Sequence, residues 1–172
     1  MRPAAGEVLH FSEDPAIEVF RPHVAKTAQQ ATPYVWAVGH DRAPDYWFPR
    51  QCPRAMAWVG PSTTSADRDR IIGAGSGTRV HAVEYGWLDA MRSVKLYAYR
   101  LPASLFTVND AAVVATTEVR PLGPPERVRD LFELHDEASI QLRVLSRLHD
   151  FWAEVTASSL EWSGIRLRNA RP

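Results

Sequence analysis

Residues 34–58 read YVWAVGHDRAPDYWFPRQCPRAMAW, a stretch that predicts two strands joined by a proline-containing turn. The apolar run over residues 34–38 is too short for a helix, which favours a buried strand. A second strand is predicted to begin at Met56, after two prolines that interrupt regular structure. Each proline is followed directly by an arginine, Arg50 and Arg54. Aromatic side chains and arginines therefore converge on one unit, a combination that suits a pocket for a flat, anionic ligand.

The patterning on either side of this stretch predicts strands first and helices later. The strands are expected near residues 8–11, 34–38, 94–101 and 111–119. Beyond residue 126, apolar residues recur at spacings of three and four, which predicts a main helical region between residues 126 and 158. Short strands followed by helices favour an α+β fold with a mostly antiparallel sheet that is split or curved.

The composition predicts one globular domain over residues 1–172, since the chain is 45% hydrophobic. Its formal net charge is zero, so no overall attraction to nucleic acid or to a membrane is expected. Of the 20 basic residues, only Lys26 and Lys95 are lysines. Arginine forms planar, bidentate contacts with phosphate, which favours a phosphate-bearing ligand. The alternative is that the arginine content reflects a GC-rich genome.

The single cysteine, Cys52, excludes an intramolecular disulfide and fits a reducing cytoplasm. The first residues lack the apolar run of a signal peptide. No apolar stretch approaches the roughly 20 residues that a membrane span needs. We therefore expect a cytoplasmic location without membrane binding. No histidine adjoins Cys52 in the sequence, so a buried structural thiol is favoured over a nucleophile.

Two side chains outside the central stretch are candidates for chemistry. Alternation along the first predicted strand places His10 on the opposite face from Leu9 and Phe11. A histidine beside a cleft both donates and accepts hydrogen bonds, and the alternative is a structural histidine. Glu118 lies at the end of the strand predicted over residues 111–119. It is either solvated there or, facing a cleft, able to stabilise developing positive charge.

Two weaker patterns point to a loop and disfavour a metal site. Residues 73–77 read GAGSG, but a dinucleotide fingerprint needs its third glycine one position later, so we expect a flexible loop. His81 and Glu84 stand three positions apart and would point to opposite faces of a strand. A metal-dependent hydrolase is therefore the third and least favoured interpretation, and no metal ligand is assigned.

Three short motifs together resemble the ADP-ribosyltransferase-like superfamily, which includes RNA 2′-phosphotransferases. They are LHFS at residues 9–12, YVWA at residues 34–37 and TTEV at residues 116–119. The resemblance implies the fold of that superfamily and NAD as cofactor. By analogy with its His–Tyr–Glu class, His10 would bind the NAD ribose, and Tyr34 or Trp36 would stack on nicotinamide. Glu118 would stabilise the cation formed as nicotinamide leaves.

Arg50 and Arg54 would hold the pyrophosphate of such a ligand, unless they form surface ion pairs instead. A wider pattern of FPR, CPR and IRLRNA motifs resembles a bacterial family of uncharacterised proteins over nearly the whole chain. The expected function is that of an ADP-ribosyl transferase or 2′-phosphotransferase acting on a nucleic acid, a nucleotide or a small molecule. The alternative is a non-catalytic module that binds a nucleotide or an anion.

Overall fold

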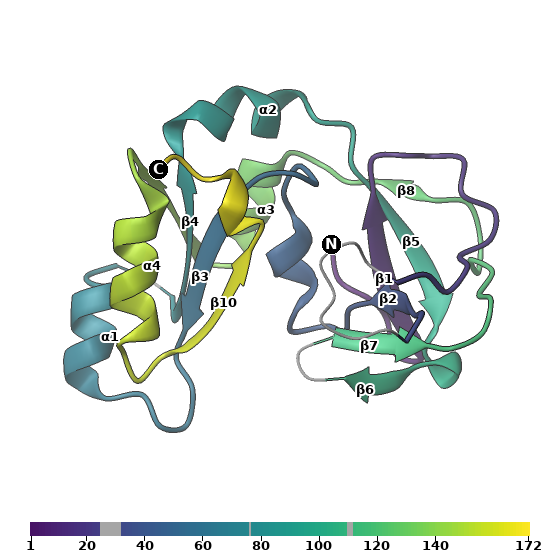
Figure 1. Ribbon diagram of the computed structural model, residues 1–172, viewed down its shortest axis with the longest axis horizontal. Coiled ribbons are helices and arrows are strands. Elements are labelled where there is room, and N and C mark those ends of the chain that lie inside the picture. Colours follow the sequence, from purple (N-terminus) through teal and green to yellow (C-terminus); the bar gives the residue numbers. More distant parts are fainter. Residues whose placement is uncertain (25–31, 76, 110–111) are drawn as a thin grey trace. The chain divides into compact units, whose positions relative to one another are not determined.

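The computed structural model (Figure 1) describes residues 1–24, 32–75, 77–109 and 112–172. These residues form two compact units, and each unit combines two segments of the chain. The first unit consists of Met1–Trp47 and Lys95–Val128, and the second of Phe48–Val94 and Arg129–Pro172. The single domain expected from length and composition stays a prediction.

The first unit contains two three-stranded antiparallel sheets. Its strands are β1 (Glu7–Ser12), β2 (Val35–Ala37), β5 (Tyr97–Pro102), β6 (Thr107–Asn109), β7 (Ala112–Ala115) and β8 (Glu126–Arg127). One sheet has the order β1-β5-β8 and the other β2-β7-β6. A bridge between Leu9 and Val38 joins β1 to the residue that follows β2. The predicted first two strands are therefore neighbours in space.

The second unit is built on a four-stranded sheet of order β10-β3-β4-β9. Its elements are β3 (Arg54–Trp58), α1 (Ser65–Ile71), β4 (Arg79–Glu84), α2 (Leu88–Ser93), α3 (Leu131–Glu137), β9 (Ile140–Leu145), α4 (Leu148–Thr156) and β10 (Glu161–Ile165). Pairing is antiparallel except between β4 and β9, which run parallel. The described residues thus form a mixed fold of mostly antiparallel sheets with four α-helices.

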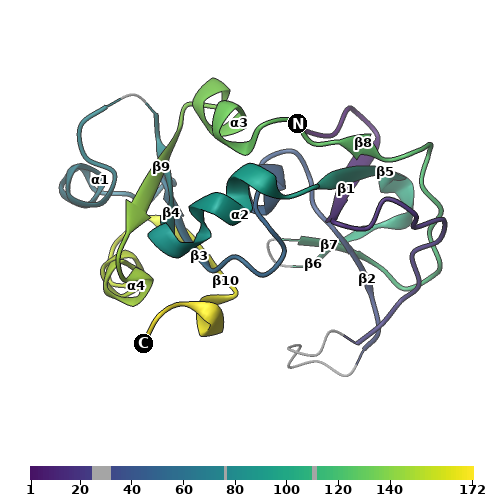
Figure 2. The same ribbon diagram turned by 90° about the horizontal axis from the view of Figure 1, so that it is seen from above.

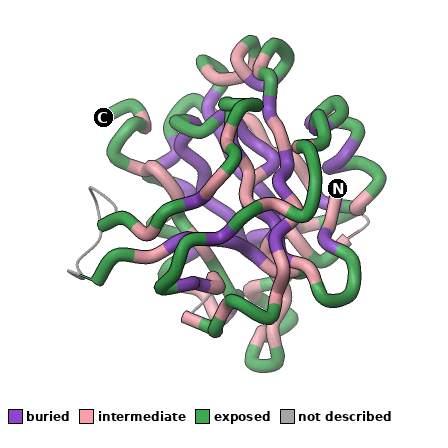
Figure 3. The backbone as a smooth tube through the Cα atoms, turned by 90° about the vertical axis from the view of Figure 1, so that its right-hand side faces the viewer, coloured by how far each residue is buried: buried purple, intermediate pink, exposed green. Residues whose placement is uncertain are grey.

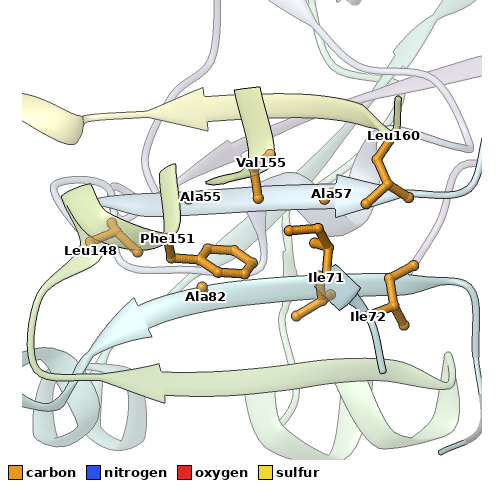
Figure 4. Close-up of a cluster of buried hydrophobic side chains, with 10 residues drawn as sticks. Ala55, Ala57, Ile71, Ile72, Ala82, Leu148, Phe151, Val155 and Leu160 are labelled. Carbon is orange, nitrogen blue, oxygen red and sulfur yellow. The ribbon is translucent and has the colours of Figure 1, made fainter. Parts of the chain in front are cut away.

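Alternation along the central strands divides the side chains of the second unit between the two faces of the sheet. Figure 4 shows Ala55 and Ala57 of β3 and Ala82 of β4 beneath larger side chains from α1 and α4. Small residues on the sheet let the helices approach closely, and the helices supply the bulk of this core. Both helices are seen nearly end-on in Figure 2. The opposite face carries Arg54 and His81, which are also buried.

The core of the first unit gathers apolar side chains from β1, β2, β5 and β7. Its buried members are Val8, Phe20, Val35, Ala37, Tyr99, Leu101, Ala115 and Val119. Figure 3 colours the most buried backbone segments purple. The strands predicted near residues 8–11, 34–38 and 94–101 are confirmed as β1, β2 and β5. Alternation between a buried and a less buried face is seen in β2, where Trp36 lies between the buried Val35 and Ala37, but not in β1.

Two expectations about the strands and helices are corrected. The helical region predicted between residues 126 and 158 is interrupted by β9, because the stretch from Ile140 to Leu145 pairs with β4 instead of continuing a helix. The strand predicted over residues 111–119 is confirmed only as β7, which ends at Ala115, so Glu118 follows the strand rather than ending it. Residue 111 lies outside the described residues.

The Tyr99 hydroxyl on β5 forms hydrogen bonds with the backbone of the loop that follows β1. It donates to the carbonyl oxygen of Asp14 (2.7 Å) and accepts from the backbone N–H of Ile17 (3.0 Å). We expect Tyr99→Phe to lower the free energy of unfolding by about 1–2 kcal/mol, because both backbone groups lose a partner. Urea unfolding measures this change. Tyr97→Phe on the same strand is the control, and an equal effect in both variants would contradict the assignment.

Candidate functional site

A pocket in the first unit lies between β1 and β2. Its cavity volume is about 70 Å³, and it is lined by Leu9, His10, Phe11, Trp36, Ala37, Val38, Tyr46 and Ala112. The rings of Phe11 and Tyr46 lie nearly parallel, at an interplanar angle of 5° with centroids 6.4 Å apart. Flat aromatic surfaces with a few polar groups are typical of sites for planar ligands.

His10 is held in a fixed orientation at this pocket. Its Nδ1 lies 2.7 Å from the carbonyl oxygen of Trp36. A carbonyl oxygen only accepts hydrogen bonds, so Nδ1 carries the proton, and in the neutral ring Nε2 is the acceptor nitrogen. The imidazole also packs against the Phe20 ring, with centroids 4.6 Å apart. The histidine on β1 and the aromatic residue on β2 that were singled out from the sequence therefore meet.

The structure distinguishes Trp36 from Tyr34, because only Trp36 lines the pocket. The Tyr34 ring packs edge-on against the indole, with centroids 5.8 Å apart, and so supports it from the side. The indole Nε1 is buried, and within the described part of the chain it has no hydrogen-bond partner. Leaving such a donor unpaired costs about 1–3 kcal/mol, a cost that an acceptor on a ligand would offset.

Glu118 is exposed and forms an ion pair with Arg21, with Oε1 2.7 Å from Nε. The next residue, Val119, exchanges two backbone hydrogen bonds with Phe20 (2.8 and 2.9 Å). Because the Phe20 ring contacts His10, a single aromatic side chain links the strand of His10 to the backbone beside Glu118. The pocket lining does not include Glu118, so a shared cleft for His10 and Glu118 stays a prediction.

The two candidate arginines belong to the second unit. Arg50 is exposed, whereas Arg54 on β3 is only 3% exposed. Its Nη1 donates to the carbonyl oxygen of Cys52 (3.0 Å), and its guanidinium lies over the Phe48 ring, 5.1 Å from the centroid. Apolar flanking residues draw Arg54 into the sheet. Anion binding by Arg50 and Arg54 stays a prediction.

Cys52 is not suited to nucleophilic attack. The thiol is buried, and this burial raises its pKa to about 12 even though Arg54 acts in the opposite direction. The thiolate is the reactive form of a cysteine. At neutral pH Cys52 is almost entirely in the unreactive thiol form. Among the described residues, no three His, Cys, Asp or Glu side chains gather closely enough to hold a metal ion.

Sequence patterns missed two residues of the pocket region. Tyr46, in a short 3-10 helix (Ala43–Tyr46), lines the pocket, and Phe20 supports His10. Tyr46 was part of the central stretch, but nothing in the local pattern distinguished it from the neighbouring aromatic residues. Phe20 reaches His10 because its backbone pairs with Val119, 99 positions later in the chain, and such a pairing leaves no local signal.

A family model matches residues 9–170, which is nearly the whole chain. The chain belongs to this family of unknown function, DUF6886. No match was found among curated proteins or among solved structures. The predicted likeness of the DUF6886 chain to an uncharacterised family is thus confirmed, whereas the ADP-ribosyltransferase-like fold stays a prediction. In the described ranges of the DUF6886 chain, no helix has the length and apolar character required to cross a membrane.

Proposed function

We propose that this DUF6886 chain binds the nicotinamide riboside end of NAD at the β1–β2 pocket and acts as an ADP-ribosyltransferase-like or 2′-phosphotransferase-like protein. The observation that carries the proposal is the hydrogen bond between His10 Nδ1 and the Trp36 carbonyl oxygen. It orients the imidazole at a pocket that Trp36 also lines, and an imidazole and an indole are the two groups that such a ligand would use for its ribose and its ring. A nucleic acid, a nucleotide or a small molecule would be the acceptor.

The chemistry of the pocket fits a pyridine nucleotide in two respects. The rings of Phe11, Trp36 and Tyr46 offer apolar surface to a planar base. The buried indole N–H of Trp36 is suited to a carbonyl acceptor such as the carboxamide oxygen of nicotinamide, once a small movement of the ring exposes it. His10, with its orientation set by β2, would hydrogen-bond a ribose hydroxyl.

The proposed reaction assigns the charged role to Glu118. Bound NAD supplies an N-glycosidic bond whose cleavage releases nicotinamide and leaves positive charge on the ribose. His10 orients the ribose, and the Glu118 carboxylate stabilises that charge as it develops. Arg21 holds this carboxylate at 2.7 Å, so Glu118 exchanges an exposed ion pair for its role at the ligand. Such exposed pairs contribute at most about 1 kcal/mol to stability, so releasing Glu118 from Arg21 costs little free energy.

The same ion pair favours a second candidate function. With Glu118 bound by Arg21 and absent from the pocket lining, the chain would bind a nucleotide or an anion without turning it over. The two candidates share the pocket and differ in whether Glu118 leaves Arg21. Nicotinamide release separates them, whereas ligand binding alone does not.

Binding of NAD is expected to depend on Trp36. We expect Trp36→Ala to weaken NAD binding by about 10-fold or more, because stacking of a base on an aromatic ring contributes roughly 1–3 kcal/mol. Calorimetric titration with NAD measures the change. Trp162→Ala, at an exposed tryptophan of the second unit, is the control and should bind NAD as the unchanged protein does. An unchanged protein that fails to bind NAD would overturn the proposal.

A further inference from the structure

Asn109, the last residue of β6, lies next to the β1–β2 pocket in the sheet of the first unit. Its register partner is Ala112, the first residue of β7, and Ala112 lines the pocket. The two strands are seen next to one another in Figure 1. Directly opposed residues of antiparallel strands project to one face of a sheet, with Cβ atoms about 4.5–5.5 Å apart. The Asn109 side chain therefore starts beside a residue of the pocket lining.

The strand registers show that Asn109 and Trp36 project to the same face of this sheet. Trp36 of β2 lies opposite Val114 of β7, and Val114 lies opposite Thr107 of β6. Alternate residues of a strand point to the same side, so Ala112 and Asn109 lie on the face of these three residues. Trp36 and Ala112 both line the pocket, which places Asn109 at its border.

The Asn109 amide is available to a ligand. The residue is half-buried, and within the described ranges its side chain has no hydrogen-bond partner. An amide offers a carbonyl oxygen as acceptor and an N–H₂ group as donor. The preceding residue, Val108, points to the opposite face and is 81% exposed. Asn109 thus brings both a donor and an acceptor to the border of the pocket.

The lining of the pocket is suited to a neutral polar group. The described residues that form it include no Arg, Lys, Asp or Glu. Its polar side chains are those of His10, Trp36 and Tyr46, and the buried indole N–H of Trp36 has no partner among the described residues. A neutral polar group needs only hydrogen-bond partners there. An ionised group would lose its hydration without an opposite charge in the lining to replace it.

We propose that Asn109 is a specificity-determining residue of the β1–β2 pocket, and that it selects a ligand whose planar ring carries a neutral carboxamide. The inference rests on the proposed function, in which the Trp36 N–H donates to the carboxamide oxygen. The carbonyl oxygen of Asn109 would accept from the N–H₂ group of the same carboxamide. Both halves of the ligand's amide then have a partner, and no charged side chain is needed.

A carboxylate in place of the carboxamide fits this arrangement poorly. A carboxylate only accepts hydrogen bonds, so the Asn109 amide would have to turn its N–H₂ group toward it. The negative charge would still lie against a lining without Arg or Lys. We therefore expect NAD to bind at least about 10-fold more tightly than nicotinic acid adenine dinucleotide, its carboxylate counterpart.

Calorimetric titration of the full chain with these two dinucleotides tests the inference. In Asn109→Ala, NAD binding should weaken about fivefold or more, because the carboxamide N–H₂ loses its acceptor. Val108→Ala, on the opposite face of the same strand, is the control and should bind NAD as the unchanged protein does. Full NAD affinity in Asn109→Ala would overturn the inference and leave the proposed function standing. Failure of the unchanged protein to bind NAD would overturn both.

Asn109→Asp separates a contact with the ligand from a structural role in β6. Aspartate keeps the size of the side chain and an acceptor for the carboxamide, so NAD affinity should stay within about threefold. Its charge would face the carboxylate of the second dinucleotide, and the preference for NAD should rise by roughly 10-fold or more. A change that is equal for both dinucleotides, or equal affinities of the unchanged protein for the two, would refute the role of Asn109.

Discussion

Glu118→Gln is expected to bind NAD as tightly as the unchanged protein and to release nicotinamide at least about 100 times more slowly. Glutamine keeps the shape of the side chain and removes the negative charge. Binding in the β1–β2 pocket depends on His10 and Trp36 and is left intact. The rate falls because the proposed transition state carries positive charge that the Glu118 carboxylate would offset. The lost ion pair with Arg21 is exposed and contributes little to stability.

Calorimetric titration with NAD and an assay of nicotinamide release measure the two quantities separately. Glu126→Gln is the matched control, because Glu126 is also a partly exposed glutamate of the first unit that pairs with an arginine, Arg100. This control should retain both binding and release. Equal rates in the Glu118 and Glu126 variants would exclude the role of Glu118. NAD binding without release by the unchanged protein would favour the non-catalytic module.

Gly77→Ala is expected to lower the free energy of unfolding by about 3 kcal/mol or more. Gly77 has a φ of +102°, and a Cβ atom there would lie 2.1 Å from the carbonyl oxygen of Ser139. Ser139 is itself in the left-handed region, with a φ of 53°, so its backbone has little freedom to move. The cost combines backbone strain at residue 77 with displacement of the turn between α3 and β9.

Gly73→Ala separates these two contributions. Gly73 also has a positive φ, +78°, but the nearest atom to its Cβ would be the Asp69 carbonyl oxygen at an ordinary 3.7 Å. We therefore expect Gly73→Ala to lower the free energy of unfolding by only about 1–2 kcal/mol, because alanine is strained in the left-handed conformation. Urea unfolding of both variants provides the comparison. Equal losses would show that the close approach to Ser139 contributes nothing.

The sequence determined the elements whose signals are local. The short apolar run over residues 34–38 located β2, and strand-type residue patterns located β1 and β5, because these signals lie within each segment whatever its partners are. The cap of α1 is also local, since the Thr64 side chain accepts from the Asp67 N–H at 3.2 Å, three positions along the chain. The GAGSG loop was also a local prediction. The close approach of the Ser139 carbonyl oxygen to Gly77 could not be predicted from that loop.

The candidate site likewise depended partly on local sequence and partly on the tertiary structure. Residue types nominated His10 and an aromatic residue near position 36, but the bridge from Leu9 to Val38 was needed to bring their strands together. The choice of Trp36 over Tyr34 required the pocket itself, since both lie on one face of the strand. Glu118 was predicted at the end of a strand, but β7 ends at Ala115, and the pairing of Glu118 with Arg21 became visible only in three dimensions.

Tertiary structure alone decided the second unit's buried polar groups and its parallel strand. Ile140 to Leu145 matches a helical spacing, yet it forms β9 because β4 offers an edge to which its backbone can hydrogen-bond. His81 and His135 are 54 positions apart, and neither neighbourhood signals the other. Local sequence fixes which conformations a segment prefers. Burial and pairing between distant segments depend on which surfaces meet, and that is decided only when the whole chain packs.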